Sequence, residues 1–367
     1  MKKRFSAAGF LVALVLGGGA LNNHLVADGV VSPVSQANYR DGKFFNEEAV
    51  APTSLARTLG IMLRFFTEKK VHAAPDIVLP VKPLSRAQLL ELPTDALHMI
   101  KLGHSSILLK VYGEFWLIDP VFAERASPFS FMGPKRFHPT PISIEELPDI
   151  ARVLISHNHY DHLDKAAICQ LQSKTRHFMV PRGVESDLQK WGVAADKIIS
   201  FDWWQEYSVE QGMIAFTPTR HFSGRGLSDA NNSLWGSWVI KTHNERLFFS
   251  GDSGYFQGFK EIGRKYGPFD ITFMETGAYD SDWPDVHMTP EQSLMAHIDL
   301  RGKVMMPIHN GTFDLAFHAW YEPLERILQL ADKQQVHLLT PLPGEVLGYG
   351  SSLTTERWWQ ALVPLSR

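Results

Sequence analysis

Cysteine is nearly absent from this chain of 367 residues, in which Cys169 stands alone. A single thiol excludes an intramolecular disulfide, and it also excludes a zinc site built mainly from cysteines. Any zinc site in this chain must use histidines and carboxylates. Such a ligand set favours a catalytic over a structural role.

An excess of positive charge is lacking as well. Lysine and arginine number 36 against 39 acidic residues, so the net charge is −3, and no basic stripe is interleaved with aromatic residues. This composition gives no electrostatic footprint for nucleic acid. Hydrophobic residues make up 44% of the chain, which is typical of a folded protein with a large core.

The N-terminus has an apolar run, but a short one. Basic residues at positions 2–4 precede the apolar residues 7–16, and small residues lead to a cleavage point after Ala20 or Ala27. This pattern predicts an export signal or an uncleaved membrane anchor at residues 1–27. We therefore expect a bacterial exported protein, periplasmic or anchored in the inner membrane and facing the periplasm. A buried first helix is the alternative.

Residues 28–95 are expected to form an irregular N-terminal lead-in with one helix, from Ser54 to Lys70. Apolar side chains recur there at helical spacing: Leu55, Leu59, Met62, Leu63 and Phe66. Basic residues flank this stripe. A basic amphipathic helix can lie on a membrane surface, and packing on the catalytic domain is the alternative.

Residues 96–367 have the pattern of one α/β domain. Short apolar runs that end in polar or glycine-containing turns predict strands at 106–111, 115–118, 152–155, 213–216, 237–240, 246–249, 271–274 and 303–306. Helices are expected near 164–174, 183–191, 289–299 and 320–333. Thr289-Pro290 is a typical helix start, with threonine as the N-cap and proline in the first turn.

Four of these predicted strands are followed at once by residues that bind metals. The strand at 152–155 runs into the segment 157–162, and three others end just before an isolated histidine or aspartate. Open α/β sheets place their sites at the carboxyl ends of strands, so these segments are expected to converge. The candidate metal ligands are His157, His159, Asp161, His162, His221, Asp252 and His309.

Seven ligands are too many for one tetrahedral ion. They suit two ions about 3.5–4 Å apart that share a carboxylate and a water. Imidazoles and carboxylates bind zinc, iron or manganese, and the histidine majority favours zinc. We therefore expect two Zn²⁺ ions per chain. Metal binding makes hydroxide available at neutral pH, so the sequence predicts a metal-dependent hydrolase.

The motif His157-x-His159-x-Asp161-His162, followed by isolated His, Asp and His residues, resembles the metal signature of the metallo-β-lactamase superfamily. The chain is also similar to the N-acylphosphatidylethanolamine-hydrolysing phospholipase D branch and its bacterial relatives over roughly residues 97–330. The matching stretches are 118–122, 125–128, 132–137, 154–164, 202–204, 234–238, 251–255, 259–263, 267–270, 277–279 and 311–313. The first 95 residues do not match convincingly.

This resemblance implies a four-layer αβ/βα sandwich of the metallo-β-lactamase type, with the metals in a groove at one edge. By matching motif positions, the first zinc would be held by His157, His159 and His221. The second would be held by Asp161, His162 and His309, with Asp252 bridging the two.

The resemblance also implies a phosphodiesterase of phospholipase D type. Its substrate would be N-acylphosphatidylethanolamine or a similar lipid, and its products phosphatidic acid and an N-acylethanolamine. Membrane-surface association is then expected, and a homodimer is compatible with it. One alternative is a hydrolase of a lactone, an amide or a cyclic phosphate on the same fold. Another is a non-enzymatic, membrane-associated binding protein, which the complete ligand set disfavours.

We assign Asp161 and His287 as the candidate catalytic residues. His287 lies just before the predicted helix start at Thr289, where it could contact the phosphoryl group or protonate the leaving oxygen; a surface loop histidine is the alternative. Asp119 and His104 are expected to support the ligands from behind. The ring of Tyr160 could face the cleft or pack beneath its loop.

Overall fold

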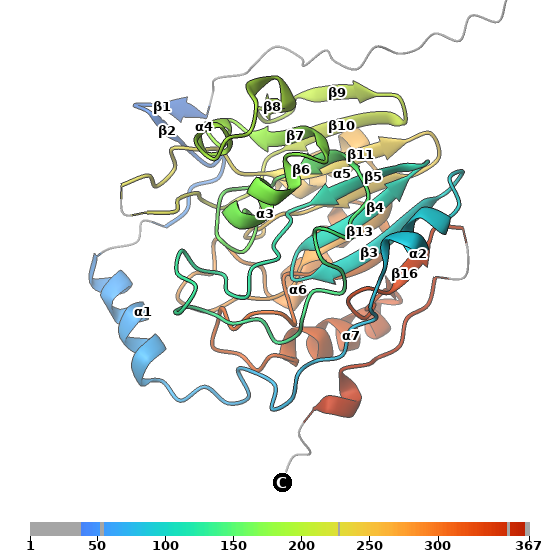
Figure 1. Cartoon of the computed structure of the whole chain (residues 1–367). Helices are drawn as coiled ribbons and strands as arrows, with labels where there is room; N and C mark the ends of the chain where they lie inside the picture. The colour runs from blue at the N-terminus through green and yellow to red at the C-terminus, as the bar shows by residue number, and fades with distance from the viewer. Residues whose placement is uncertain (1–37, 52–54, 227, 351–352, 364–367) are drawn as a thin grey trace, which may run out of the picture.

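The computed structural model describes residues 38–51, 55–226, 228–350 and 353–363. The predicted signal or anchor segment, residues 1–27, lies outside these described residues. Two large sheets pack face to face, and helices cover their outer faces (Figure 1). This arrangement confirms the predicted four-layer αβ/βα sandwich.

Each large sheet has seven strands. The first has the order β16-β3-β4-β5-β6-β7-β8, with the strands β3 (Leu97–Gly103), β4 (Ser106–Val111), β5 (Glu114–Ile118), β6 (Ile150–Leu154), β7 (Thr175–Pro181), β8 (Ile198–Phe201) and β16 (Val346–Gly348). The second has the order β15-β14-β13-β12-β11-β10-β9, with β9 (Glu206–Val209), β10 (Gly212–Thr217), β11 (Ser237–Thr242), β12 (Arg246–Phe249), β13 (Phe269–Glu275), β14 (Gly302–Ile308) and β15 (His337–Leu338).

The two sheets repeat one pattern of strand pairing. In the first, β16 to β5 pair antiparallel and β5 to β8 pair parallel. In the second, β9 to β12 pair antiparallel and β12 to β15 pair parallel. In both sheets, therefore, parallel strands deliver their carboxyl ends to a common edge.

Successive apolar side chains along a strand point into different layers of the core. In β4, Ile107 and Leu109 belong to the core between the sheets, whereas Leu108 belongs to the core beneath the helices. Because successive side chains point to opposite faces, a strand covered on both faces must be apolar throughout. The tryptophan Trp238 of β11 fills the inter-sheet core, and its indole N–H donates to the carbonyl of Ile155 at 3.1 Å.

Helices cover the outer faces of both sheets. The first sheet is covered by α2 (Arg86–Glu91), α3 (Lys165–Leu171) and α4 (Glu185–Lys190), and the second by α5 (Gly258–Tyr266), α6 (Pro290–Asp299) and α7 (Glu322–Gln334). The predicted start of α6 is correct: Thr289 caps the helix with a capping box, and Pro290 lies in its first turn. Two short 3₁₀ helices lie at Ala195–Lys197 and Gln360–Leu362.

Most predicted elements are found, but several were missed. The eight predicted strands correspond to β4, β5, β6, β10, β11, β12, β13 and β14, and the four predicted helices to α3, α4, α6 and α7. Within the domain, the helix α5 and six strands were not predicted: β3, β7, β8, β9, β15 and β16. β7 begins with three polar residues, and α5 has no side-chain cap at its N-terminus, so neither gives the usual local signal.

The N-terminal segment has more structure than the single helix expected. The predicted helix is α1 (Leu55–Thr67), but the short strands β1 (Tyr39–Arg40) and β2 (Lys43–Phe44) precede it and α2 follows it. The helix α2 has a capping box formed by Ser85 and Gln88, a signal that was overlooked. Within the described residues, no helix is long and apolar enough to cross a membrane.

The inter-sheet core yields a stability prediction. Leu109→Ala should lower the free energy of unfolding by about 2–5 kcal/mol, because it leaves a cavity between the sheets where Leu109 is 0% exposed. Leu90→Ala is the matched control, since this side chain is 53% exposed and its loss should cost under about 0.5 kcal/mol. Chemical denaturation of both variants measures the difference, and equal losses would contradict the layer assignment.

Candidate metal centre

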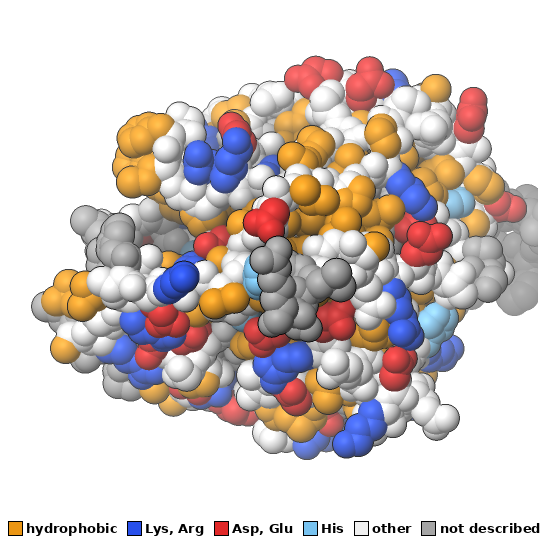
Figure 2. All heavy atoms as spheres, turned by 90° about the horizontal axis from the view of Figure 1, so that it is seen from below, with side chains coloured by type: hydrophobic (Ala, Val, Ile, Leu, Met, Phe, Trp, Pro, Cys, Tyr) orange, Lys and Arg blue, Asp and Glu red, His pale blue; other side chains and the backbone are white. Residues whose placement is uncertain are grey.

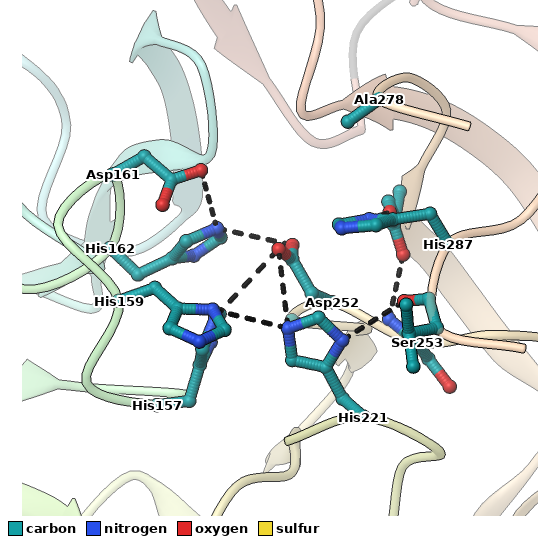
Figure 3. Close-up of polar contacts among 12 residues, drawn as sticks. His157, His159, Asp161, His162, His221, Asp252, Ser253, Ala278 and His287 are labelled. Atoms are coloured by element: carbon teal, nitrogen blue, oxygen red, sulfur yellow. Dashed lines mark hydrogen bonds and ion pairs between the residues drawn. The ribbon is translucent and has the colours of Figure 1, made fainter. Parts of the chain in front are cut away.

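All seven predicted ligands lie together at the edge where the two sheets meet, and Figure 3 labels six of them, all except His309. The segment that carries four of them follows β6, and His221, Asp252 and His309 follow β10, β12 and β14. Their donor atoms form groups in which all atoms lie within 4.8 Å of one another. The convergence expected from the strand ends is therefore observed.

The first group consists of His157, His159, His221 and Asp252. The Nδ1 atom of His159 lies 2.9 Å from Nε2 of His157 and 3.2 Å from Nε2 of His221. Burial lowers the pKa of all three histidines, that of His159 to about 4. Neutral imidazoles keep a free lone pair at neutral pH, so these three nitrogens are ready to bind a cation.

The second group consists of His104, Asp161, His162 and His309. The Oδ2 atom of Asp161 lies 3.0 Å from Nε2 of His104 and 3.2 Å from Nε2 of His309. Burial opposes a charge on His309, but Asp252 and Asp161 outweigh it and raise the pKa of His309 to about 10. Burial likewise opposes the charge on both aspartates, yet the neighbouring histidines hold their pKa values well below the usual range.

Asp252 joins the two groups, and it also belongs to a third group with Glu275, His287 and His309, whose donor atoms lie within 4.8 Å of one another. Its Oδ2 lies 3.7 Å from Nε2 of His157, 3.8 Å from Nε2 of His221 and 3.0 Å from Nε2 of His309. Its Oδ1 lies 3.1 Å from Nε2 of His162. A carboxylate in contact with both groups has the place required of a bridging ligand.

The donor set fits divalent cations. Nε2 of His162 and Oδ1 of Asp252 are buried and have no hydrogen-bond partner, although they lie 3.1 Å apart. Two acceptor atoms that face each other outside hydrogen-bond geometry can both be satisfied by one cation between them. Imidazole nitrogens and carboxylate oxygens are the ligands that zinc prefers in the absence of thiolates.

Residues outside the donor groups hold the histidine rings in position by contacting their Nδ1 atoms, as expected for Asp119. Its Oδ2 accepts a hydrogen bond of 2.7 Å from Nδ1 of His162, and its Oδ1 accepts one of 2.7 Å from the backbone N–H of Ser156. Nδ1 of His157 lies 2.9 Å from the hydroxyl of Ser156, and Nδ1 of His221 lies 2.9 Å from the carbonyl of Val286. With Nδ1 occupied, each ring presents Nε2 to the centre.

His104 lies closer to the centre than expected. It was predicted to support a ligand from behind, and its Nε2 does contact Asp161, but it also belongs to the second donor group. Burial lowers the pKa of His104 to about 3. Tyr160 lines a separate cavity of about 690 Å³ rather than the cleft at the donor groups; Arg225 lies 4.0 Å over its ring, and the tyrosine hydroxyl donates to the carbonyl of Arg225 at 2.8 Å.

Two further residues of the site were missed in the sequence. Asn46 of the N-terminal segment donates to the carbonyl of His221 at 2.7 Å and accepts from its N–H at 3.0 Å. Glu275, at the end of β13, is fully buried and accepts hydrogen bonds from His287 and from the backbone N–H of Ser253. Glu275 could have been found, because it follows the same strand-end rule as the ligands.

The donor groups line a cleft of about 720 Å³. One wall is α1, through Arg57 and Ile61, and another is the loop that carries Trp283 and His287. Arg64 of α1 forms ion pairs with Asp280 and Asp282 of that loop. The N-terminal helix and the His287 loop therefore enclose the cleft together, and His287 lies inside it, as predicted.

Comparison with known proteins agrees with this geometry. Residues 116–310 match the family model of the beta-lactamase superfamily domain. An uncharacterized protein of Mycobacterium tuberculosis is 40% identical over 329 residues, which cover 88% of this chain and 87% of that protein. The N-acyl-phosphatidylethanolamine-hydrolyzing phospholipase D 1 of Caenorhabditis elegans is 34% identical over 247 residues, covering 64% of this chain and 69% of the relative.

A solved structure shares the fold. Igni18, a metallo hydrolase from the archaeon Ignicoccus hospitalis, superimposes with a TM-score of 0.54 at 21% identity and covers 69% of this chain and 98% of its own. The family match, the relatives and the fold lead to one conclusion. The chain belongs to the beta-lactamase superfamily and resembles its N-acylphosphatidylethanolamine-hydrolysing phospholipase D branch.

Proposed function

We propose that this protein is a dinuclear zinc phosphodiesterase of phospholipase D type that acts on N-acylphosphatidylethanolamine or a similar lipid. The observation that carries the proposal is the pair of donor groups joined by Asp252 at the base of the cleft. The similarity to a named phospholipase D of Caenorhabditis elegans supports the substrate class. The alternative is hydrolysis of a lactone, an amide or a cyclic phosphate at the same centre.

In this proposal the chain's own residues hold and orient the reacting groups. His157, His159 and His221 would hold one ion, and Asp161, His162 and His309 would hold the other, with Asp252 shared. The bound ions supply a nucleophile at neutral pH and neutralise charge that develops on the phosphoryl oxygens. Asp119 and Ser156 hold the rings of His162 and His157 through Nδ1, so their Nε2 atoms face the centre.

His287 is the residue proposed to act on the leaving group. It belongs to the cleft wall, and its side chain is 15% exposed. Its ring centroid lies 5.2 Å from that of His221 and 5.3 Å from that of His309, so the ring stands between the two donor groups. From there it could contact a phosphoryl oxygen or give a proton to the departing alcohol.

Exposed apolar side chains suit a lipid surface, and we propose membrane-surface association. Leu59 and Leu63 of α1 are 56% and 62% exposed, and Phe131 is 77% exposed. In Figure 2 apolar side chains gather along the left edge, the side on which α1 lies in Figure 1. Export across the inner membrane by residues 1–27 and a homodimer also remain proposals.

A substrate panel tests the proposed function. The purified zinc-loaded protein should cleave N-acylphosphatidylethanolamine and release an N-acylethanolamine, and a chelated sample should not. A generic phosphodiester and a lactone complete the panel. Lactone turnover without cleavage of any phosphodiester would overturn the proposal in favour of the alternative.

His159→Ala should remove most of the bound metal and most of the activity, because Nδ1 of His159 lies within 3.2 Å of both other histidine donors of its group. Metal analysis of the purified variant measures the loss. His243→Ala is the matched control, since this histidine is exposed at the turn between β11 and β12. Two metals per chain in His159→Ala would refute its assignment as a ligand.

His287→Ala should retain both metals and lower the turnover rate by about 10²-fold or more, the usual contribution of a positioned proton donor. The reason is that His287 lies in the cleft but outside the ligand set assigned to the two ions. Steady-state kinetics and metal analysis on the same preparation check both statements. Unchanged kinetics would remove His287 from the mechanism.

A further inference from the structure

Glu275 is a buried carboxylate that the proposed reaction has not used. Its side chain is 0% exposed, and it lies at the end of β13, beside β14, which leads to His309. Both carboxylate oxygens are engaged. Oε1 accepts a hydrogen bond from Nδ1 of His287, and Oε2 accepts one of 2.6 Å from the backbone N–H of Ser253.

The backbone of Glu275 is held as firmly as its side chain. Its N–H donates to the hydroxyl of Ser250 at 2.9 Å, and its carbonyl accepts a hydrogen bond of 2.5 Å from the hydroxyl of Ser293 on α6. It is also in register with Ile308, the residue before His309. The carboxylate is thus fixed relative to the strand ends that carry Asp252 and His309.

The position of this carboxylate determines which ring nitrogen of His287 faces the cleft. Oε1 of Glu275 and Nδ1 of His287 share a hydrogen bond. An ionised carboxylate can only accept in such a bond, so in this pair Nδ1 carries the hydrogen and Nε2 is left for the substrate. Figure 3 shows the ring of His287 extending toward the group around Asp252. In a catalytic His–carboxylate pair the carboxylate holds the ring through Nδ1, while Nε2 takes up and gives off the proton.

We propose that Glu275 is a positioning residue that makes His287 the proton donor to the leaving alcohol. This inference rests on the proposed phosphodiesterase function. A water-derived oxygen forms a bond to phosphorus, and the phosphorus–oxygen bond to the alcohol breaks. The bonding pair goes to the alcohol oxygen, which takes the proton from Nε2 of His287. Throughout the reaction, Nδ1 of the imidazole stays hydrogen-bonded to Glu275. The proton that the attacking water releases then reprotonates Nε2.

The competing explanation is that Glu275 only anchors the loop that carries His287. The two roles differ in their dependence on the leaving group. An alkyl alcohol leaves poorly unless it is protonated, whereas p-nitrophenolate needs no proton. Loss of a proton donor should therefore slow the release of an alkyl alcohol much more than the release of p-nitrophenolate. Loss of a loop anchor should slow both reactions equally.

The test is Glu275→Gln assayed on N-acylphosphatidylethanolamine and on phosphatidyl-p-nitrophenol. Glutamine replaces one of the two carboxylate oxygens with an NH₂ donor, so it cannot accept at both the Oε1 position facing His287 and the Oε2 position facing Ser253. We expect a rate loss of about 10²-fold on the first substrate and less than about threefold on the second, with metal content unchanged. His287→Ala should show the same selectivity, and the double variant should lose no more than either single variant. Equal losses on both substrates would overturn the proposal.

Glu345→Gln is the matched control. This carboxylate pairs with Lys82 and accepts a hydrogen bond from the backbone of Leu342, remote in sequence from the ligands. The variant should match the unmodified protein on both substrates.

A second measurement does not depend on turnover. In ¹⁵N-histidine spectra of the full chain, with the His287 signal assigned by its loss in His287→Ala, Nδ1 should carry the hydrogen. In Glu275→Gln this preference should weaken or reverse. An unchanged tautomer would overturn the proposal. If the unmodified protein cleaves neither phosphodiester, the proposed function fails by itself, and the spectra still decide whether Glu275 sets the tautomer.

Discussion

The carboxylate of Asp252 is buried among four imidazoles, and the architecture of the site follows from this burial. A buried charge is costly unless it is paired, and Asp252 and Asp161 together place two negative charges at the meeting edge of the sheets. Nitrogen atoms of His157, His162, His221 and His309 lie 3.0–3.8 Å from Asp252. Burial lowers the pKa of His157 and His221, whereas Asp252 and Asp161 outweigh burial and raise the pKa of His309. A divalent cation can pair with the carboxylates and bind the neutral rings at the same time.

The two sheets repeat one pattern of strand pairing, and this repetition brings the ligand-bearing strand ends together. Both sheets pass from antiparallel to parallel pairing at equivalent positions, so the ends of β6, β12 and β14 reach one edge from opposite sides of the core. The inter-sheet packing of residues such as Leu109 and Trp238 fixes the distance between those ends. The ligand geometry therefore depends on the core, and the hydrogen bonds of Asp119 and Ser156 adjust only the rings.

The sequence was informative where the signal was local. The dense motif from His157 to His162 and the strand-end positions of His221, Asp252 and His309 were enough to predict which residues come together. Glu275 also lies at a strand end and could have been found by the same rule, but its hydrogen bond to His287, twelve residues away, has no signal in the sequence. Asn46 was missed because its contact with His221 spans 175 positions, and no spacing rule covers such a distance. The position of the N-terminal segment in the cleft wall could not be predicted for the same reason. That position depends on ion pairs between α1 and the His287 loop, which are far apart in the sequence.

The most direct test of the account is the position of the metals. Crystals of the zinc-loaded protein, measured at the zinc absorption edge, should show two anomalous peaks about 3.5–4 Å apart on either side of Asp252. One peak should lie against His157, His159 and His221, and the other against Asp161, His162 and His309. A single peak, or a pair that does not share Asp252, would contradict the dinuclear centre.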